Sequence, residues 1–290
     1  MRRQFRQFNP YAVFVYYLVI IGATVMSRHP VFSLLSFFFS VIYGYIVDRE
    51  KLSRLIKMII PLMIFTVLVN SLFNHYGVTR LFRLPSGNNV TLEVLFQGIL
   101  LTSSFGAVSV WLLDSTDALD YQKFMHILRH VFPGIVLVMT MSIRFIPLYS
   151  KQVRLIIDAQ KGIGNLKEEK GYRKRLKNSL DIFSILTSWA LENSIETADS
   201  MRARGYGLKK RTSYRRYSFN YKDALLLTAA AVTAVMLIMA GHRGLLTVKY
   251  NPVIKFPVFD TVGYLSYAAF ALLAALPVMV EIYGEKKWNF

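Results

Sequence analysis

Long apolar runs separated by short polar stretches dominate this chain. A helix needs about 20 apolar residues to cross the roughly 30 Å hydrocarbon core of a bilayer, and several runs reach or approach that length. The pattern therefore predicts an all-α, polytopic membrane protein with about six transmembrane helices. The runs are Tyr11–Met26, Val31–Val47, Met58–Phe73, Leu92–Leu113, Phe132–Leu148, Ala224–Gly241 and Val262–Ile282.

Basic residues are distributed unevenly between the polar stretches. The chain holds 35 Lys and Arg against 17 Asp and Glu, a formal net charge of +18. Cytoplasmic loops of membrane proteins collect Lys and Arg. With Arg2, Arg3 and Arg6 inside, both termini fall in the cytoplasm, and topology explains the charge without a nucleic-acid partner. The loops then expected outside carry only six of the 35 basic residues: Arg28, Arg80, Arg83, Arg243, Lys249 and Lys255.

One segment, Tyr149–Lys222, is especially basic, with 17 Lys and Arg against seven Asp and Glu. If Phe132–Leu148 crossed the membrane, this segment would lie outside, against the positive-inside rule. We therefore expect Phe132–Leu148 to lie along the cytoplasmic face or only dip into it. Because proline inside a helix removes a hydrogen bond and kinks it, we expect interruptions at Pro133, Gly134, Arg144 and Pro147.

The basic segment predicts helices with polar breaks between them. Glycine just past the last helical residue is the usual C-terminal stop. The chain thus divides into N-terminal transmembrane helices at 1–113, interfacial and cytoplasmic helices at 114–222, and a C-terminal transmembrane hairpin at 223–290. Within the middle part we expect one helix over Ser142–Lys161 stopped by Gly162 and Gly164, a charged linker at Asn165–Lys174, a helix to about Trp189, and another over Ser188–Arg204 stopped by Gly205 and Gly207.

A basic motif closes the last of these helices. Arg204 stands between Ala203 and Gly205, two small residues that leave room for another backbone to approach. The planar guanidinium group suits a bidentate pair with a carboxylate of a partner protein. An ordinary basic helix end near anionic lipid headgroups is an equally good interpretation of this motif taken alone.

The motifs of this region carry a family resemblance. Ala203-Arg204-Gly205 resembles the second Ala-Arg-Gly signature of the transmembrane T component of energy-coupling factor (ECF) transporters. Arg144-Phe145-Ile146-Pro147 resembles the stretch that opens the coupling region in that family, which makes Arg144 and Pro147 candidate hinge residues. Gln160-Lys161-Gly162 falls where the first signature belongs. Since lysine keeps the charge but lacks the planar fork, we expect a less exact contact there. The resemblance extends from His29-Pro30 to about Tyr206.

The resemblance implies a non-catalytic scaffold in the plasma membrane of a prokaryote. Two cytoplasmic ATPases would bind ATP and Mg²⁺ and dock on the two signatures. A membrane-embedded S component would bind the micronutrient, a vitamin or a metal ion, and reorient. The chain itself is expected to bind no cofactor, and it has no G-x-x-x-x-G-K-[ST] loop for ATP.

An apolar stripe runs from the end of the preceding predicted helix into the last one, opposite Glu192, Glu196 and Asp199. Such a stripe usually packs against protein, and the acidic residues are best explained as a solvated face. The resemblance makes the stripe a candidate packing surface for the S component. Its members are Ile185, Leu186, Trp189 and Ile195.

Two other functions deserve comparison. A membrane-embedded enzyme could use a metal held near Asp117, His126 and His130, because the two histidines are spaced i, i+4 and share a helix face. A self-contained carrier would place charged residues within several spans, and these spans have almost none. Charge is concentrated in one cytoplasmic segment instead, which favours the docking role without a metal site in this chain.

Overall fold

The computed structural model describes residues 5–74, 77–83, 89–164, 172–208, 217–248, 250, 254, 257 and 260–286. It divides into two compact units, which we call the core unit (residues 1–124 and 217–290) and the paired-helix unit (residues 125–216). Several features used above lie outside the described residues, namely most of the predicted charged linker (165–171) and the residues Arg2, Arg3, Lys249 and Lys255.

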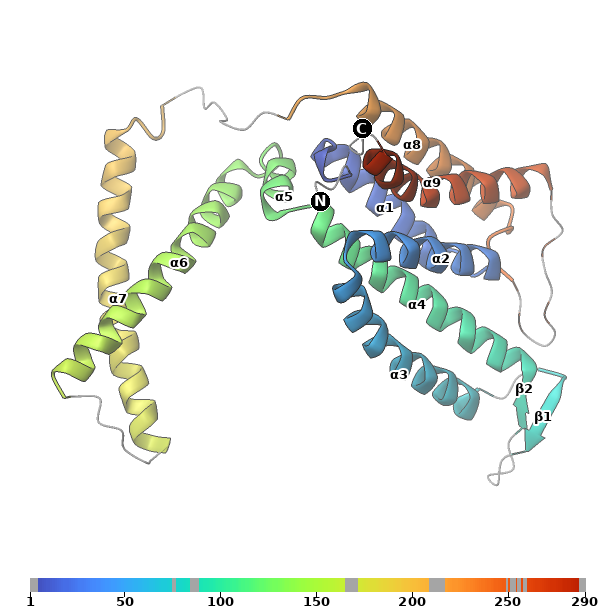
Figure 1. Ribbon diagram of the computed structural model, residues 1–290, viewed down its shortest axis with the longest axis horizontal. Helices are drawn as coiled ribbons and strands as arrows, with labels where there is room; N and C mark the ends of the chain where they lie inside the picture. Colours follow the sequence, from blue (N-terminus) through green and yellow to red (C-terminus); the bar gives the residue numbers. More distant parts are fainter. Residues whose placement is uncertain are drawn as a thin grey trace. The chain divides into compact units, whose positions relative to one another are not determined.

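Helices build almost all of the described chain (Figure 1). The short 3-10 helix η1 (Phe5–Gln7) opens the core unit, and α5 (Tyr121–Leu128) crosses the boundary to the paired-helix unit, which holds α6 (Pro133–Gly162) and α7 (Tyr172–Ala203). The rest of the core unit consists of α1 (Pro10–Met26), α2 (Pro30–Val47), α3 (Arg49–Phe73), α4 (Leu92–Ala118), α8 (Tyr221–His242), α9 (Thr261–Lys286) and a hairpin of β1 (Arg80–Arg83) and β2 (Asn89–Thr91).

Six helices of the described part are long and apolar enough to cross a membrane, namely α2, α3, α4, α6, α8 and α9. The prediction of an all-helical protein with about six apolar spans is therefore confirmed. Two details differ from the expectation. Helix α1 has 17 residues and falls just short of that length, whereas α6, which was expected at the interface, has the length and composition of a span.

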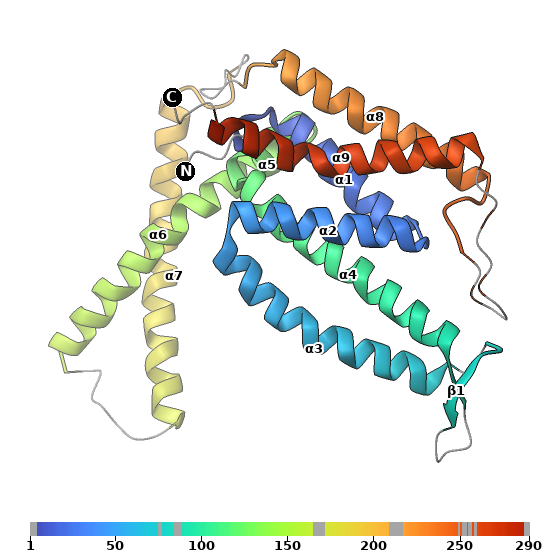
Figure 2. The same ribbon diagram turned by 45° about the vertical axis from the view of Figure 1, so that its right-hand side comes forward.

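Helix α2 lies at the centre of the core unit, packed against α4 and α9 (Figure 2). Its buried serines hydrogen-bond to the neighbouring helices. The hydroxyl oxygens of Ser33 and Ser104 of α4 lie 2.7 Å apart in a hydrogen bond, and Trp111 Nε1 of α4 donates to Ser36 Oγ at 3.0 Å. Small polar residues let apolar helices approach closely and link them in a membrane. The face of α2 that carries these serines is therefore fixed against α4.

Loop segments close the two ends of the core unit. At one end the Arg28 N–H donates to the Leu246 carbonyl oxygen at 2.9 Å, and the Tyr250 hydroxyl group donates to the Arg28 carbonyl oxygen at 3.2 Å. At the other end Phe5 is fully buried, and its N–H donates to Glu281 Oε1 at 3.1 Å. The α8–α9 connection and the N-terminal segment thus tie together helices that are distant in the sequence.

The helix ends predicted beside Gly162 and Gly205 are confirmed, but the interruptions predicted within Phe132–Leu148 and near Trp189 are wrong. Helix α6 runs unbroken for 30 residues, and α7 for 32. Pro133 occupies the first turn of α6, where its missing N–H leaves no bond unmade, so it begins the helix. Pro147 removes one interior bond without ending α6. No glycine or proline lies within α7, so nothing ends a helix near Trp189.

The sequence pattern also missed the hairpin. The stretch between α3 and α4, which holds Arg80 and Arg83, was expected only as a loop outside the membrane, but β1 and β2 pair antiparallel in it, with Phe82 opposite Val90 and Arg83 opposite Asn89. Four- and three-residue strands are too short to show a clear alternation of apolar and polar positions. The hairpin leads directly into α4 through Thr91.

Candidate functional site

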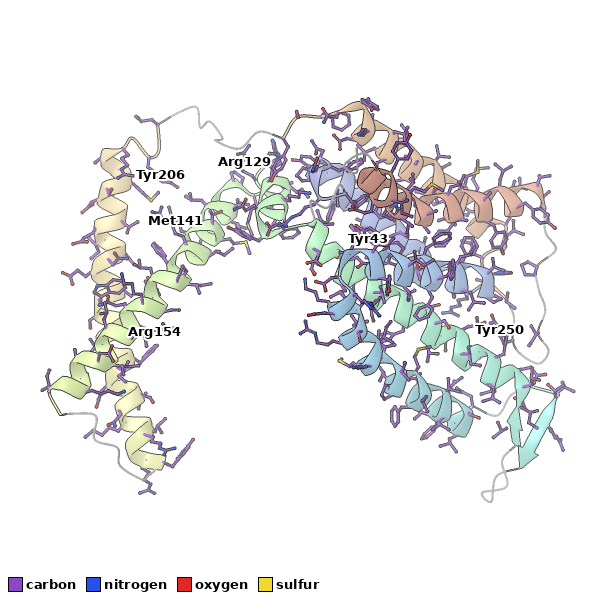
Figure 3. The ribbon with its side chains drawn as sticks, in the orientation of Figure 1. Tyr43, Arg129, Met141, Arg154, Tyr206 and Tyr250 are labelled. Atoms are coloured by element: carbon purple, nitrogen blue, oxygen red, sulfur yellow. The ribbon has the colours of Figure 1, made fainter. Side chains whose placement is uncertain are left out.

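The two helices of the paired-helix unit cross near their middles. Figures 1 and 3 show α6 and α7 crossing in opposite directions. Tyr149 of α6 and Trp189 of α7 meet edge to face, with ring centroids 5.6 Å apart, and Phe145 stacks on Tyr149 at 5.6 Å. Edge-to-face and offset-stacked pairs are the favoured aromatic geometries. The crossing is therefore held by aromatic packing, supported by the buried Ile156 of α6.

This crossing divides the apolar stripe predicted on α7. Leu186 and Trp189 are half-buried, and Trp189 packs on Tyr149 within the same unit. Ile185 is 38% exposed and Ile195 is 65% exposed. Leu186 and Trp189 thus lie on the inner face of the pair, and Ile185 and Ile195 remain on the outer surface. Glu192, Glu196 and Asp199 are all exposed.

The C-terminal end of α7 has a Schellman cap. The Gly205 N–H donates to the Arg202 carbonyl oxygen at 2.9 Å, and the Tyr206 N–H donates to the Met201 carbonyl oxygen at 2.9 Å. Gly205 has φ +79°, the left-handed conformation that such a cap requires and that glycine adopts without strain. The cap makes Ala203 the last helical residue and leaves the Arg204 side chain exposed.

The C-terminal end of α6 carries the first candidate signature. Gln160 is half-buried, whereas Lys161 and Gly162 are exposed. Gly162 is the last helical residue, and the left-handed glycine is Gly164, with φ +78°. Lys161 therefore lies inside the last helical turn, where a cation interacts favourably with the negative end of the helix dipole.

Both candidate docking ends are therefore accessible and well separated. The residues from Tyr149 to Gly162, and from Trp189 to Ala203, span about 20 Å each at 1.5 Å per residue. Because the helices run in opposite directions, their C-terminal ends lie on opposite sides of the crossing (Figure 1). The hinge candidates Arg144 and Pro147 are exposed on α6. This arrangement exposes one basic side chain at each of two separate helix ends, Lys161 on α6 and Arg204 on α7.

The charges on α7 form only a weak local pair. Arg202 Nη1 lies 3.9 Å from Asp199 Oδ1, and both side chains are mostly exposed. Exposed pairs of this kind contribute little, because water screens them and ordering both side chains costs entropy. Arg202 is consequently available to a partner at little energetic cost.

Comparison with known proteins identifies the family. Residues 1–214 match the family model CbiQ, described as cobalt transport protein. The chain belongs to the CbiQ family. Members of this family are transmembrane components of ECF transporters, as the resemblance implied, and the role is that of a non-catalytic transporter subunit in the membrane.

Curated relatives support the assignment across most of the chain. Two of them are named energy-coupling factor transporter transmembrane protein EcfT. The relative from Lactobacillus helveticus is 25% identical over 237 residues, covering 78% of this chain and 86% of its own. The relative from Staphylococcus aureus is 24% identical over 246 residues, covering 80% and 90%. The CbiQ-family chain is thus a multi-pass membrane protein of an ECF transporter.

Asp117 of the alternative metal site, and the nearby Asp120, have other partners in this CbiQ-family chain. Lys51 Nζ donates to Asp117 at 2.8 Å, and Arg6 Nη2 donates to Asp120 at 3.0 Å. His126 and His130 have ring centroids 5.8 Å apart, and burial, together with Arg129, lowers the pKa of His126. Across the described ranges, no three His, Asp or Glu side chains gather as metal ligands.

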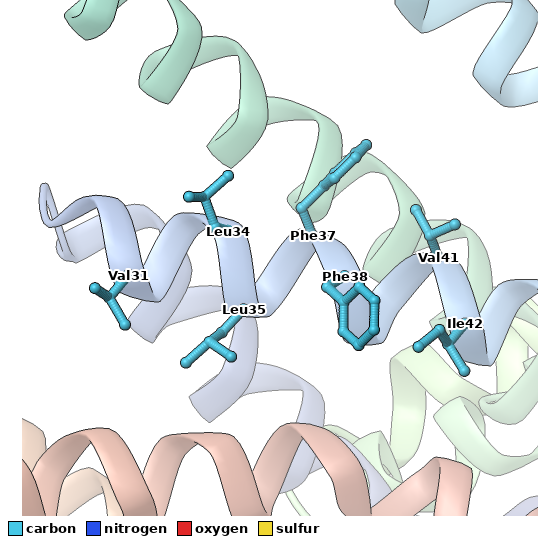
Figure 4. Close-up of a pocket in the computed structure, with 7 residues that line it drawn as sticks. All are labelled: Val31, Leu34, Leu35, Phe37, Phe38, Val41 and Ile42. Carbon is cyan, nitrogen blue, oxygen red and sulfur yellow. The ribbon is translucent and has the colours of Figure 1, made fainter.

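One face of α2 forms an open apolar hollow on the core unit (Figure 4). Aliphatic and aromatic side chains line it, and Phe38 is 59% exposed. Such a surface matches lipid chains or another apolar helix. The lining residues are Val31, Leu34, Leu35, Phe37, Phe38, Val41 and Ile42.

Sequence reasoning missed a polar cluster that holds the N-terminal segment of the core unit. Asn9 N–H donates to Asp223 Oδ1 at 2.8 Å, and Lys123 Nζ donates to the Arg6 carbonyl oxygen at 2.6 Å and to the Ala118 carbonyl oxygen at 3.0 Å. Asp223 belongs to a capping box with Asn220, and that Asn-x-x-Asp spacing was the one available sequence signal. Nothing local in the sequence marks Lys123.

Proposed function

We propose that this chain couples ATP hydrolysis by two cytoplasmic ATPases to reorientation of a substrate-binding S component. In this proposal ATP and Mg²⁺ reside on the ATPases, and the paired-helix unit is the part that they contact. The observation that carries the proposal is the exposure of the two basic ends, Lys161 on α6 and Arg204 on α7, on opposite sides of one packed crossing. Two separated contact points fit two ATPase subunits.

Charge supports a cytoplasmic location for both termini. In the core unit, one end gathers the Arg6–Asp120 and Lys51–Asp117 pairs and the buried Lys123. The opposite end carries Arg28, the Arg243–Asp260 pair, and Arg80 and Arg83 of β1, whereas the first end also holds Arg49, Arg54 and Lys57 of α3 and Lys222 of α8. Following the positive-inside rule, we assign the first end to the cytoplasm.

The same rule assigns α6 to the cytoplasmic face. If α1 to α4, α8 and α9 span the membrane, the chain enters and leaves the paired-helix unit on one side, and the basic segment stays inside. Spanning by α6 would instead move α7 and its basic ends outside, against the rule. The exposed apolar residues of α6, among them Ile135, Val138 and Ile146, would then contact the interface or a membrane partner.

The outer face of α7 supplies a surface for the S component. Leu180, Leu191 and Ile195 are exposed on one side of the helix, and Phe183 and Ile185 are exposed on its two flanks. Because the crossing packs Trp189 inside the unit, movement of the ATPases at the helix ends would shift this whole face as a rigid piece. The S component, in this proposal, determines whether a vitamin or a metal ion is transported.

Charge reversal at Arg204 tests the proposed function. We expect Arg204→Glu to abolish ATP-driven uptake in vesicles reconstituted with the whole transporter, because a carboxylate of the ATPase would then face a like charge. Membrane insertion should remain normal, since Arg204 is exposed at a helix end. Arg175→Glu, an exposed reversal near the other end of α7, is the matched control. Unchanged uptake by the Arg204→Glu transporter would refute the proposal.

A further inference from the structure

The C-terminal ends of α6 and α7 have the same pattern of capping hydrogen bonds. In α7 the Arg204 N–H donates to the Ser200 carbonyl oxygen at 3.1 Å, and the Gly205 N–H donates to the Arg202 carbonyl oxygen at 2.9 Å. In α6 the corresponding bonds run from Ile163 to Ala159 at 3.1 Å and from Gly164 to Lys161 at 3.0 Å. Gly205 and Gly164 have nearly equal φ angles of +79° and +78°.

These bonds set the register between the ends. Gly164 corresponds to Gly205, so Ile163 corresponds to Arg204 and Lys161 corresponds to Arg202. The alignment expected from the sequence, which pairs Lys161-Gly162 with Arg204-Gly205, is therefore wrong by two residues. Gly162 is still helical, so it cannot be the counterpart of the left-handed Gly205. The rest of the sequence agrees with the cap. In both ends an acidic residue is followed three positions later by a basic residue, then by a small residue, and the stretch ends two positions further on at the glycine. The two stretches are Asp158–Gly164 and Asp199–Gly205.

Ile163 consequently occupies the position from which Arg204 points outward. Its side chain is 72% exposed at the tip of α6. A single exposed isoleucine is ordinary on a protein surface. This one stands at the backbone position that carries the docking guanidinium group on the other end.

We propose that Ile163 is the docking side chain of the first end and that the two ends select chemically different receiving sites. Arg204 would enter an acidic site on one ATPase, and Ile163 an apolar site on the other; this rests on the proposed function. Lys161 and Arg202 flank the two contacts equivalently. Binding of each helix end to the other end's site is unfavourable. Arg204 would lose its hydration in the apolar site, and the carboxylate of the acidic site would be buried without a partner.

Site-directed photo-crosslinking tests this assignment directly. The chain contains no cysteine, so an introduced cysteine is the single thiol of this subunit, and partner subunits freed of cysteine remove the background labelling. Ile163→Cys and Arg204→Cys are to be labelled in the purified transporter, irradiated, and the captured peptides identified by mass spectrometry. We expect each position to capture a different ATPase site, apolar around 163 and acidic around 204. Arg175→Cys is the matched position remote from both ends and should capture neither.

Substitutions of Ile163 test the same assignment through the rate of uptake. Ile163→Leu should retain uptake, whereas Ile163→Arg should reduce it at least tenfold although it restores an arginine at the corresponding position. Capture of the same acidic site from both positions, or full uptake by Ile163→Arg, would overturn the inference. So would capture of an ATPase from Lys161→Cys but not from Ile163→Cys. Failure of every position to capture an ATPase would instead refute the proposed function.

Discussion

Tyr149 and Trp189 join the two long helices edge to face, with their ring centroids 5.6 Å apart. Each residue lies near the middle of its helix, so the contact holds the two helices together at their crossing point, about 20 Å from each C-terminal end. Two contact points for separate partners can transmit force only if the element between them is stiff. In the proposed function, the aromatic crossing would supply this stiffness.

Trp189→Ala is expected to destabilise the paired-helix unit and reduce uptake. Truncating a fully buried tryptophan costs about 3–5 kcal/mol, and for the half-buried Trp189 we expect about 2 kcal/mol. Limited proteolysis of the purified transporter measures the loss, because a loosened pair opens α6 and α7 to cleavage. Ile195→Ala, at a 65% exposed position on the same helix, is the control and should leave the cleavage rate unchanged. Equal cleavage of both variants would contradict the role of the crossing.

Removing the basic side chains one at a time should affect the two ends unequally. Arg204→Ala removes a guanidinium group that we assign to a direct pair with a carboxylate, and a charge-assisted hydrogen bond is typically worth about 1.5–3 kcal/mol. We expect uptake to fall at least tenfold. Lys161→Ala removes only a flanking cation and should cost about threefold or less. Uptake rates in reconstituted vesicles at matched protein density provide the comparison, and a larger effect at Lys161 would reverse the assignment.

The helices of the core unit follow from the sequence because membrane spans are long and their apolar runs are continuous. The positions that are hard to predict are those where the same residue type can either begin or interrupt a helix. Pro133 begins a helix instead of interrupting it, and the unbroken α7 contradicts the end predicted near Trp189. A short hairpin such as β1 and β2 has too few residues for a pattern to emerge.

The candidate site was predictable as a region but not in its register. The sequence offers two glycines at the end of α6, Gly162 and Gly164, and only the backbone conformation shows that Gly164 carries the left-handed turn. The stripe on α7 has the same difficulty. Periodicity groups Trp189 with Ile185, yet the crossing angle of the pair decides that one is packed inside and the other remains outside.

Substituting glycines of the core unit should separate packing from helix propensity. A Cβ atom added at Gly106 would meet the ring of Phe37 at 2.9 Å, whereas one added at Gly22 meets nothing within 4 Å. Alanine is favoured over glycine within a helix by about 1 kcal/mol. Gly22→Ala should therefore be neutral or stabilising, and Gly106→Ala should lower the thermal midpoint in detergent. A higher midpoint for Gly106→Ala than for Gly22→Ala would show that α2 and α4 are not closely packed.

Lys123 predicts how the stability of the core unit depends on pH. Its side chain is buried, and burial, assisted by Arg6, lowers the pKa of the amine from 10.5 to about 8. Between about pH 8 and pH 10.5 the unfolded chain therefore binds a proton that the folded chain does not. Stability attributable to this residue rises with pH across that window, since the unfolded state binds more protons there. The neutral amine still donates to the carbonyl oxygens of Arg6 and Ala118.

Comparing Lys123→Met with the unchanged chain isolates this contribution. Methionine fills a similar volume without titrating, so the thermal midpoint of the variant relative to the unchanged chain should fall as the pH is raised from 7.5 to 9.5. Lys222→Met removes an exposed lysine of the same core unit, and its relative midpoint should stay constant over that range. If the Lys123→Met variant instead gained relative stability with rising pH, the buried amine would have to be favoured in its charged form. Its two carbonyl partners would then outweigh the desolvation of the ammonium group.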